Sequence, residues 1–319
     1  MSSAAPPIEV RGLVKRYGEL TAVAGVDLTV QEGDVYGYLG PNGAGKTTSL
    51  RMMLGLIRPT AGSVRLFGRD PQATVAALDG VAGFVEAPTF YPYLSGRRNL
   101  ELLAAYDGRN ARARVDAALE VVELRDRGGD RLGGYSHGMR QRLGIAAALL
   151  RDPRLLLLDE PATGLDPAGM RDMRLLIRRL SEQGITVLLS SHLLAEVEEV
   201  CNRVAIVRSG RIVYEGEIAA LKHGAGTRYS LQTTDQERAL AVCRAQAGIE
   251  EVRRDGQAIT FSGEDAAVAL LSQALVEAGA LIQALAPQTL RLEDLFLSLT
   301  EDGDGAGAPG VAPALEARA

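Results

Sequence analysis

Residues 40–47 have the residue types and the spacing of a loop that binds phosphate. They read Gly-Pro-Asn-Gly-Ala-Gly-Lys-Thr and fit the pattern G-x-x-x-x-G-K-[ST] at every fixed position. Glycines at these positions let consecutive backbone N–H groups converge on phosphate oxygens, while Lys46 adds a positive charge and Thr47 offers a hydroxyl to Mg²⁺. The predicted nucleotide-binding residues are Gly40, Asn42, Gly43, Ala44, Gly45, Lys46, Thr47 and Thr48.

Two carboxylates and a histidine lie at the ends of apolar runs further along the chain. Asp159 and Glu160 come directly after the run Leu155–Leu158, and His192 lies just beyond a second run. One carboxylate can hold Mg²⁺, the next can orient or deprotonate an attacking water, and the histidine can hydrogen-bond the γ-phosphate. We assign Asp159 to the metal, and Glu160, His192 and Lys46 to catalysis.

These residues need a scaffold that brings several strand ends together. Between residues 8 and 218, short apolar runs alternate with helical patterns, which predicts an α/β fold with a parallel sheet covered on both faces. Ligands bind at the carboxyl ends of the strands in such sheets. The predicted strands are Val26–Val30, Val35–Leu39, Leu155–Leu158 and Ile185–Ser190; the predicted helices include Gly45–Leu56, Arg97–Tyr106 and Ala168–Glu182.

The chain is long enough for two domains, since 319 residues is about twice a typical domain. We assign residues 1–220 to the nucleotide-binding domain and residues 221–227, which contain glycine, to a linker. Residues 228–300 show the order βαββαβ, typical of a small α+β module of the ferredoxin-like type, with a two-residue hairpin turn at Asp255-Gly256 and a last helix at 292–299. The Gly-, Ala- and Pro-rich tail, 301–319, is predicted to be disordered.

Composition and charge exclude several classes of protein. The chain has 35 basic and 40 acidic residues, a net charge of −5, so nucleic acid is not an expected partner. Cys201 and Cys243 have no CxxC spacing, which disfavours a disulfide framework or a zinc site. The N-terminus does not read as a signal peptide, and no uncharged apolar run reaches the ~18 residues that span a bilayer. We therefore expect a cytosolic chain that leaves any membrane spanning to another protein.

Taken together, the motifs resemble the ATP-binding subunit of an ABC transporter over roughly residues 8–218. The phosphate loop corresponds to that family's Walker A motif, and Leu155–Glu160 to Walker B with its catalytic glutamate. Gly164-Leu165-Asp166 is similar to the D-loop, His192 to the switch histidine, and Tyr17 stands where the family stacks an aromatic ring on adenine. The resemblance implies a P-loop ATPase with a helical signature subdomain, using ATP and Mg²⁺.

The family's signature motif is present in an altered form. Residues 135–139 read Tyr-Ser-His-Gly-Met where the commonest form is Leu-Ser-Gly-Gly-Gln. Ser136 can cap the helix predicted at Gly138–Arg151 and aim its N-terminus at an anion. In the family this anion is the γ-phosphate held by the opposite subunit, which implies that Ser136 and Gly138 bind ATP across a homodimer. His137 either disturbs close packing there or adds a hydrogen-bond donor.

A second departure lies at Glu86, where the family usually has glutamine. A glutamate can still accept a hydrogen bond from a magnesium-bound water, so Glu86 joins Thr47 and Asp159 as a metal candidate. The surrounding sequence, Glu-Ala-Pro-Thr-Phe-Tyr-Pro at 86–92, resembles exporters of the drug- and antibiotic-resistance type, as does Arg-Leu-Glu-Asp-Leu-Phe-Leu at 291–297. The aromatic residues in 90–93 are predicted to face the membrane partner.

The resemblance implies the motor subunit of a bacterial exporter, peripheral to the cytoplasmic face of the plasma membrane. It would dimerise around two Mg-ATP and drive a separate polytopic permease that exports a drug, an antibiotic or another hydrophobic compound. Two other classes stay open. One is a regulatory subunit that gates a membrane sensor; the other is a soluble ABC ATPase acting on ribosomes or DNA, which the single phosphate loop and the lack of heptads disfavour.

Overall fold

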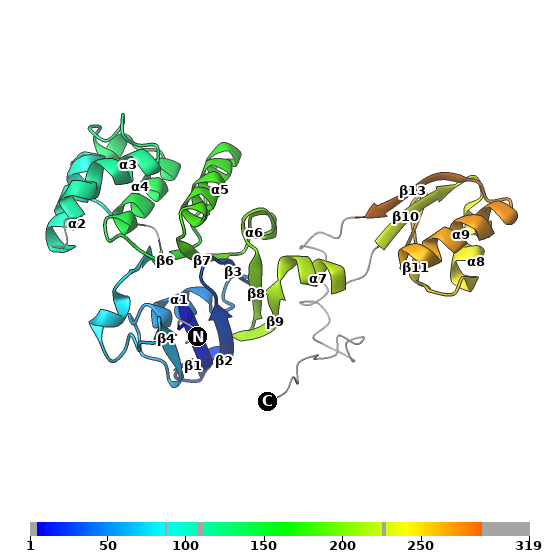
Figure 1. Cartoon of the computed structure of the whole chain (residues 1–319), viewed down its shortest axis with the longest axis horizontal. Coiled ribbons are helices and arrows are strands. Elements are labelled where there is room, and N and C mark those ends of the chain that lie inside the picture. The colour runs from blue at the N-terminus through cyan, green and yellow to red at the C-terminus, as the bar shows by residue number, and fades with distance from the viewer. Residues whose placement is uncertain (1–4, 87, 108–110, 225–227, 289–319) are drawn as a thin grey trace. The chain divides into compact units, whose positions relative to one another are not determined.

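The computed structural model describes residues 5–86, 88–107, 111–224 and 228–288. The chain divides into two compact units between Ile218 and Ala219 (Figure 1). Each unit has its own cluster of buried apolar side chains. The helix predicted at 292–299, the Arg291–Leu297 segment and the tail 301–319 lie outside the described residues. In the described part of the chain no helix combines the length and the apolar character that crossing a membrane requires.

A six-stranded sheet is the centre of the N-terminal unit, with strand order β5-β6-β7-β3-β8-β9. The first five strands are parallel, and β9 joins the edge antiparallel to β8. Every residue of β3, β6 and β7 is buried, as expected for strands covered on both faces. The α/β prediction is therefore confirmed. The strands are β3 (Val35–Leu39), β5 (Val81–Phe84), β6 (Leu155–Asp159), β7 (Thr186–Ser191), β8 (Arg203–Arg208) and β9 (Arg211–Glu217).

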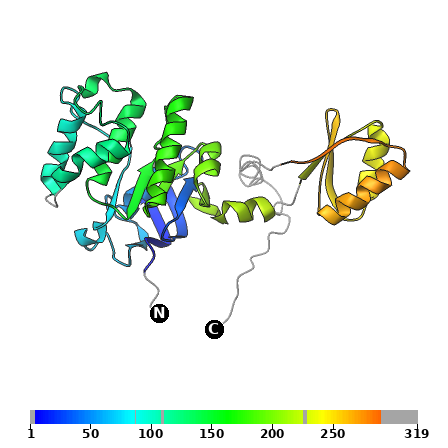
Figure 2. The same ribbon diagram turned by 45° about the horizontal axis from the view of Figure 1, so that its top comes forward.

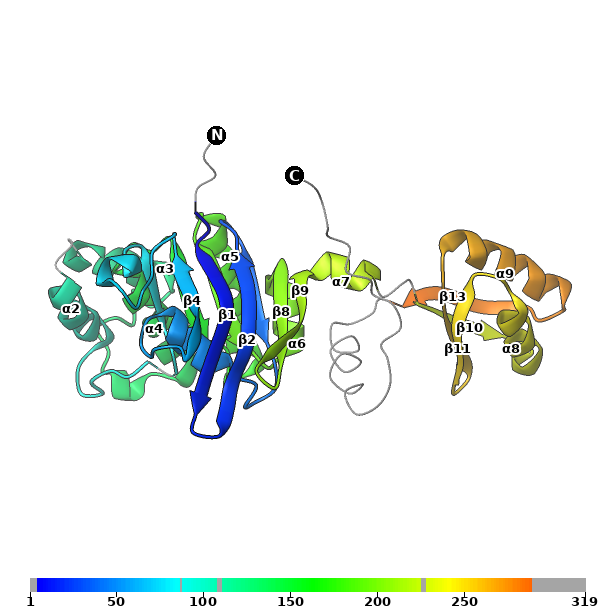
Figure 3. The ribbon, with the colours of Figure 1, turned by 90° about the horizontal axis from the view of Figure 1, so that it is seen from below.

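A second, antiparallel sheet has the order β2-β1-β4, with β1 (Ile8–Tyr17), β2 (Leu20–Val30) and β4 (Ala61–Leu66) side by side in Figure 3. The predicted strand Val26–Val30 is thus part of β2 and does not belong to the parallel sheet. The reason is the two-residue connection between β1 and β2, which can only join antiparallel neighbours. Both sheets contribute to one apolar core, in which Ile8 of β1 and Leu157 of β6 are fully buried.

Helices cover the six-stranded sheet and form a separate helical group. Helix α1 (Lys46–Met53) lies between the two sheets and contacts β2, β4 and β6, while α5 (Pro167–Glu182) and α6 (Leu194–Val200) pack on β7 and β3. The cyan-to-green helices in Figure 2 are the helical group. Its members are α2 (Gly96–Asp107), α3 (Val115–Val121) and α4 (His137–Leu149), and the short 3₁₀ segments are η1 (Val75–Leu78), η2 (Ala111–Arg114) and η3 (Leu132–Gly134).

The C-terminal unit has the predicted element order βαββαβ over its described residues. Its four strands form an antiparallel sheet in the order β11-β12-β10-β13, and Phe261 and Leu271 are fully buried in its core. The hairpin turn is Gly256-Gln257, one residue later than predicted, because Asp255 still pairs with Ala258. The elements are β10 (Arg228–Thr233), α8 (Gln236–Ala245), β11 (Ile249–Asp255), β12 (Ala258–Gly263), α9 (Asp265–Glu277) and β13 (Ile282–Gln288), preceded by α7 (Ile218–Gly224), which takes up part of the predicted linker.

Candidate functional site

The predicted phosphate loop connects the end of β3 to the start of α1. Gly45 has φ = +96°, and a Cβ there would lie 2.3 Å from the Ala22 carbonyl oxygen, so only glycine fits. Within the described part of the chain no side chain caps the N-terminus of α1, which leaves its first N–H groups available to bind an anion. Lys46, Thr47 and Thr48 follow on the first turn of α1. These features fit a phosphate group.

Lys46 lies at the centre of the site, with only 5% of its side chain exposed. Its Nζ donates hydrogen bonds to the carbonyl oxygens of Gly40, at 2.8 Å, and Pro41, at 3.2 Å. The same Nζ lies 3.2 Å from Oε1 of Glu160. The structure therefore places the positive charge of the loop against the carboxylate predicted to act as the base.

Asp159, the last residue of β6, is buried and joins two neighbouring elements. Its Oδ2 accepts a hydrogen bond from the Thr47 hydroxyl at 2.9 Å, and its Oδ1 accepts one from the Ser190 hydroxyl of β7 at 2.5 Å. A hydroxyl and a carboxylate thus meet at the start of α1, as the sequence predicts. Two hydroxyl groups therefore orient the Asp159 carboxylate from both sides.

Glu160 has a backbone conformation that is unusual for a residue other than glycine, with φ = +47°. Its N–H donates to the Ser190 carbonyl oxygen at 3.2 Å and to the Ser190 hydroxyl oxygen at 3.0 Å, which holds the strained backbone in place. Strain of this kind is kept where the surrounding contacts enforce it, often at functional sites. The turn directs the Glu160 side chain toward Lys46 and His192.

Among the residues that the structure describes, three side chains contact the Glu160 carboxylate. Oε2 accepts hydrogen bonds from the Thr163 hydroxyl and from Nδ1 of His192, both at 2.8 Å, and Oε1 faces Lys46. Partial burial by itself raises the pKa of Glu160, but the Thr163 hydrogen bond and the positive charge of Lys46 outweigh it, so the pKa lies below its ordinary value. The carboxylate is ionised near neutral pH, the form that accepts a proton.

Two predicted site residues have other partners in this structure. Glu86 is two-thirds exposed, has φ = +71°, and pairs with Arg51 of α1. Tyr17 ends β1 with 48% of its surface exposed, and the Lys15 ammonium lies 5.1 Å from its ring centroid. Both contacts lie apart from the hydrogen-bond cluster around Asp159 and Glu160.

The signature residues lie where α4 begins. Ser136 is the N-cap of this helix, and its hydroxyl oxygen accepts a hydrogen bond from the Met139 N–H at 3.2 Å, so the capping prediction is confirmed. The helix starts at His137, one residue earlier than predicted. Nε2 of His137 lies 3.1 Å from the Thr163 carbonyl oxygen and donates to it, since a carbonyl only accepts.

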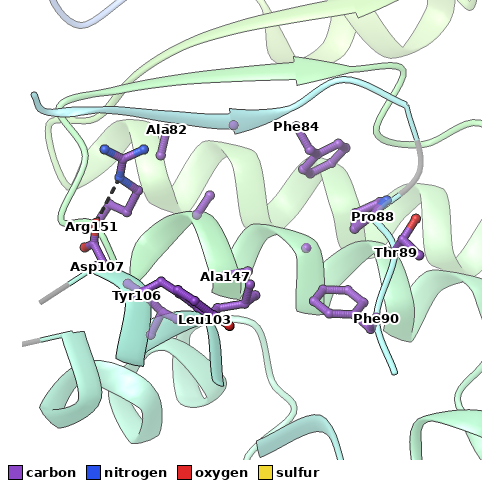
Figure 4. Close-up of a pocket in the computed structure, with 14 residues that line it drawn as sticks. Ala82, Phe84, Pro88, Thr89, Phe90, Leu103, Tyr106, Asp107, Ala147 and Arg151 are labelled. Atoms are coloured by element: carbon purple, nitrogen blue, oxygen red, sulfur yellow. Dashed lines mark ion pairs between the residues drawn. The ribbon is translucent and has the colours of Figure 1, made fainter. Parts of the chain in front are cut away.

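A groove of about 450 Å³ opens between β5 and the helical group. Phe84, Pro88 and Phe90 line one side, and Leu103 and Tyr106 of α2 line the other (Figure 4). An ion pair between Asp107 and Arg151, with 3.4 Å between Oδ1 and Nε, lies at one end. The residues that line the groove are mostly apolar. One of them, Tyr106, has 91% of its surface exposed. Such a groove suits a partner segment with an apolar face.

Sequence reasoning missed Ser190 and Thr163, which orient the two acidic residues. Ser190 lies in a strand that is buried throughout, and a fully buried hydroxyl must find a hydrogen-bond partner. The sequence contained this signal, because Ser190 and Ser191 are hydroxyl residues at the end of an otherwise apolar run. For Thr163 we find no comparable signal, because an exposed threonine in a polar turn is ordinary.

The parallel sheet, the glycine-rich loop running into α1, and the acidic pair at the end of β6 define a P-loop nucleotide hydrolase. A family model described as "ABC transporter" matches residues 23–163. The bacitracin transport ATP-binding protein BcrA of Bacillus licheniformis is 38% identical over 93% of this chain and 98% of its own length. The daunorubicin resistance ATP-binding protein DrrA3 of Streptomyces coeruleorubidus is 38% identical over 92% of this chain and 96% of its own.

Solved structures agree with this assignment. An ATP-binding subunit of an ABC transporter superposes with a TM-score of 0.61 at 27% identity, covering 68% of this chain and 92% of that one. A dimeric ATP-binding cassette with bound ADP and phosphate superposes with a TM-score of 0.59 at 25% identity, over 66% of this chain and 98% of that one. The chain belongs to the ABC transporter ATP-binding family. It binds ATP, and it hydrolyses ATP in a reaction coupled to transport.

Proposed function

We propose that Mg-ATP is held between the phosphate loop and the end of β6. The glycine-rich loop and Lys46 would bind the phosphates, and Tyr17 would stack on the adenine. The Thr47 hydroxyl and the Asp159 carboxylate, joined by a 2.9 Å hydrogen bond, are oxygen donors of the kind Mg²⁺ prefers. Bound there, Mg²⁺ would neutralise charge on the phosphate oxygens. Glu86 would contribute only through a bound water, after leaving Arg51.

Glu160 would act as the general base for hydrolysis. The oxygen of a water attacks the γ-phosphorus, the bond to the β-phosphate oxygen breaks, and Glu160 takes the proton that the water loses. His192 would hydrogen-bond the γ-phosphate from the neighbouring strand end. The observation that carries this proposal is the convergence of Lys46, Thr163 and His192 on one ionised carboxylate.

Two copies of the chain would complete each site. The α4 N-terminus, with Ser136 and Gly138, would contact the γ-phosphate bound by the other copy, using backbone N–H groups and the serine hydroxyl. The partners with which this homodimer works would be permease subunits in the plasma membrane. We place the chain at the cytoplasmic face of a bacterial membrane, attached through its partner.

The groove beside Phe90 and Tyr106 would receive a segment of the permease. Its apolar walls and its position between β5 and the helical group would let a closing dimer move that segment. By similarity to relatives named for bacitracin transport and daunorubicin resistance, we propose export of a drug, an antibiotic or another hydrophobic compound.

The test of the site is Glu160→Gln, which keeps the shape of the side chain and removes its basicity. We expect ATP binding to remain and the hydrolysis rate to fall by about 10²–10⁴, the usual contribution of a general base. Glu182→Gln, at the exposed end of α5, is the matched control. Near-normal turnover in Glu160→Gln would show that another group takes the proton.

A further inference from the structure

His137 lies on a short path between the helical group and the catalytic glutamate. It is the first residue of α4, and its ring leaves the helix toward the turn that follows Glu160. The turn accepts its Nε2–H through the Thr163 carbonyl oxygen at 3.1 Å. A glycine or alanine at position 137 has no atom that reaches this carbonyl, so the bond depends on the histidine itself.

Thr163 links this contact to the Glu160 carboxylate. Its hydroxyl donates to Oε2 of Glu160 at 2.8 Å, and its backbone N–H donates to the Glu160 carbonyl oxygen at 3.1 Å. The hydroxyl direction therefore follows from the position of the Thr163 backbone. His137 holds the Thr163 backbone through the carbonyl oxygen of that residue, and the hydroxyl of the same residue orients Glu160.

The two residues after Thr163 also lie against the first turn of α4. Gly164 has φ = +77°, and a Cβ there would lie 3.5 Å from Nε2 of His137. Likewise, a Cβ on Gly138 would lie 3.6 Å from the Leu165 side chain. Residues 163, 164 and 165 therefore each lie against the start of α4. Among the described residues, the hydrogen bond of His137 is the one directed contact of the three.

We propose that His137 is a positioning residue for ATP hydrolysis. It fixes segment 163–165 against α4, so that the Thr163 hydroxyl stays aimed at the Glu160 carboxylate, and it thereby couples the placement of the signature helix to the orientation of the base. The inference rests on the role of Glu160 proposed above. It makes position 137, where the sequence departs from the family's usual glycine, part of the hydrolytic machinery within one chain.

The test compares steady-state hydrolysis by the 319-residue chain and five variants. His137→Ala is expected to lower kcat about two- to tenfold, the worth of one net hydrogen bond, with KM for ATP and the Tm unchanged. His137→Gln keeps an N–H donor at similar reach and is expected to restore most of kcat. A purely structural role would change the Tm or KM and would not be rescued by glutamine.

A double-mutant cycle separates this role from an independent contact across a dimer. Thr163→Val removes the hydroxyl, so adding His137→Ala is expected to leave kcat at the Thr163→Val level. Three results would each overturn the proposal. The double variant could show the product of the two single reductions in kcat, His137→Ala could keep the wild-type kcat, or His137→Gln could be as slow as His137→Ala. Glu160→Gln in the same assay tests the base itself: if it is inactive while His137→Ala is normal, only the inference about His137 fails.

Discussion

At the scale of single residues, Glu160 combines strained geometry with dense contacts. A side chain on a backbone at φ = +47° costs about 1–3 kcal/mol, and the surrounding structure must hold it there. Ser190 holds the backbone, while Thr163, His192 and Lys46 hold the carboxylate. These contacts orient the carboxylate from within the chain, which is the kind of preorganisation that catalysis by a positioned group requires.

The lowered pKa of Glu160 predicts how stability responds to acid. A carboxyl with a lowered folded-state pKa stabilises the fold fully above its unfolded pKa, about 4.3, and this contribution is lost as the pH falls through the lower folded-state pKa. Without nucleotide, the Tm of the wild type minus that of Glu160→Gln is therefore expected to stay constant from pH 7 to about 5. It should shrink below about 4.3. A difference that grows on acidification would mean that the pKa is raised instead.

The sequence predicted which residues of the site lie together better than it predicted their other partners. The spacing of residues 40–47 and the acidic pair after an apolar strand indicated that Lys46, Asp159 and Glu160 meet, and the structure brings them together because parallel strands end at one edge of a sheet. The ion pair of Glu86 with Arg51 was not predictable, since it depends on how one exposed loop lies over α1.

At the scale of elements, α4 presents the start of a helix whose N-cap is Ser136. Ser136→Asp is expected to keep the cap, because aspartate caps helices about as well as serine. It also puts a negative charge where the γ-phosphate of the other copy would lie. We therefore expect unchanged Tm and ATP binding, but loss of cooperative turnover in an assay that varies protein concentration.

Ser136→Ala is the control for this experiment, because it removes the cap and adds no charge. It is expected to cost about 1 kcal/mol of stability and, because it removes one hydroxyl contact without adding charge, to lower turnover less than Ser136→Asp does. Normal cooperative hydrolysis by Ser136→Asp would argue against a phosphate at this helix terminus.

Element prediction failed most clearly at the β1–β2 hairpin. Burial alternates only along residues 8–11 of β1, and the alternating strands and helices that follow favoured assigning Val26–Val30 to the parallel sheet. The turn at Gly18-Glu19 makes β2 the antiparallel neighbour of β1, because a two-residue loop is too short for the crossover that parallel strands need. The element types in the C-terminal unit were predictable, since its strands and helices are short, regular and separated by clear turns.

At the scale of the whole molecule, the two units have separate cores and are expected to melt separately. Phe261 is fully buried in the C-terminal core, so Phe261→Ala is expected to cost about 3–5 kcal/mol there. Calorimetry should show one transition moved down, and added ATP should still raise the other. Val276→Ala, which changes an exposed side chain of α9, is the control. Loss of ATP binding in Phe261→Ala would show that the units depend on each other.

The transport proposal is tested by recovering the partner. Glu160→Gln protein with Mg-ATP, incubated with native membranes, is expected to co-purify with a polytopic membrane protein in about a 1:1 ratio. Adding Phe90→Ala and Tyr106→Ala should abolish this recovery by removing apolar contact area from the groove. Val75→Ala, exposed elsewhere, is the control. Ribosomal or nucleoid proteins in place of a membrane protein would favour a soluble ATPase, and a sensor protein would favour a regulatory subunit.

The position of β3 in the sheet has a consequence for synthesis on the ribosome. Its neighbours are β7 and β8, so Tyr36 and Tyr38 cannot be buried until residues beyond Thr186 have been made. Synthesis proceeds at about 5–20 residues per second, so β3 lacks its neighbouring strands for about 7–30 s after it has been made. During that time the nascent chain exposes a strand that is fully buried in the folded protein, and chaperones are expected to stay bound to it until β8 emerges.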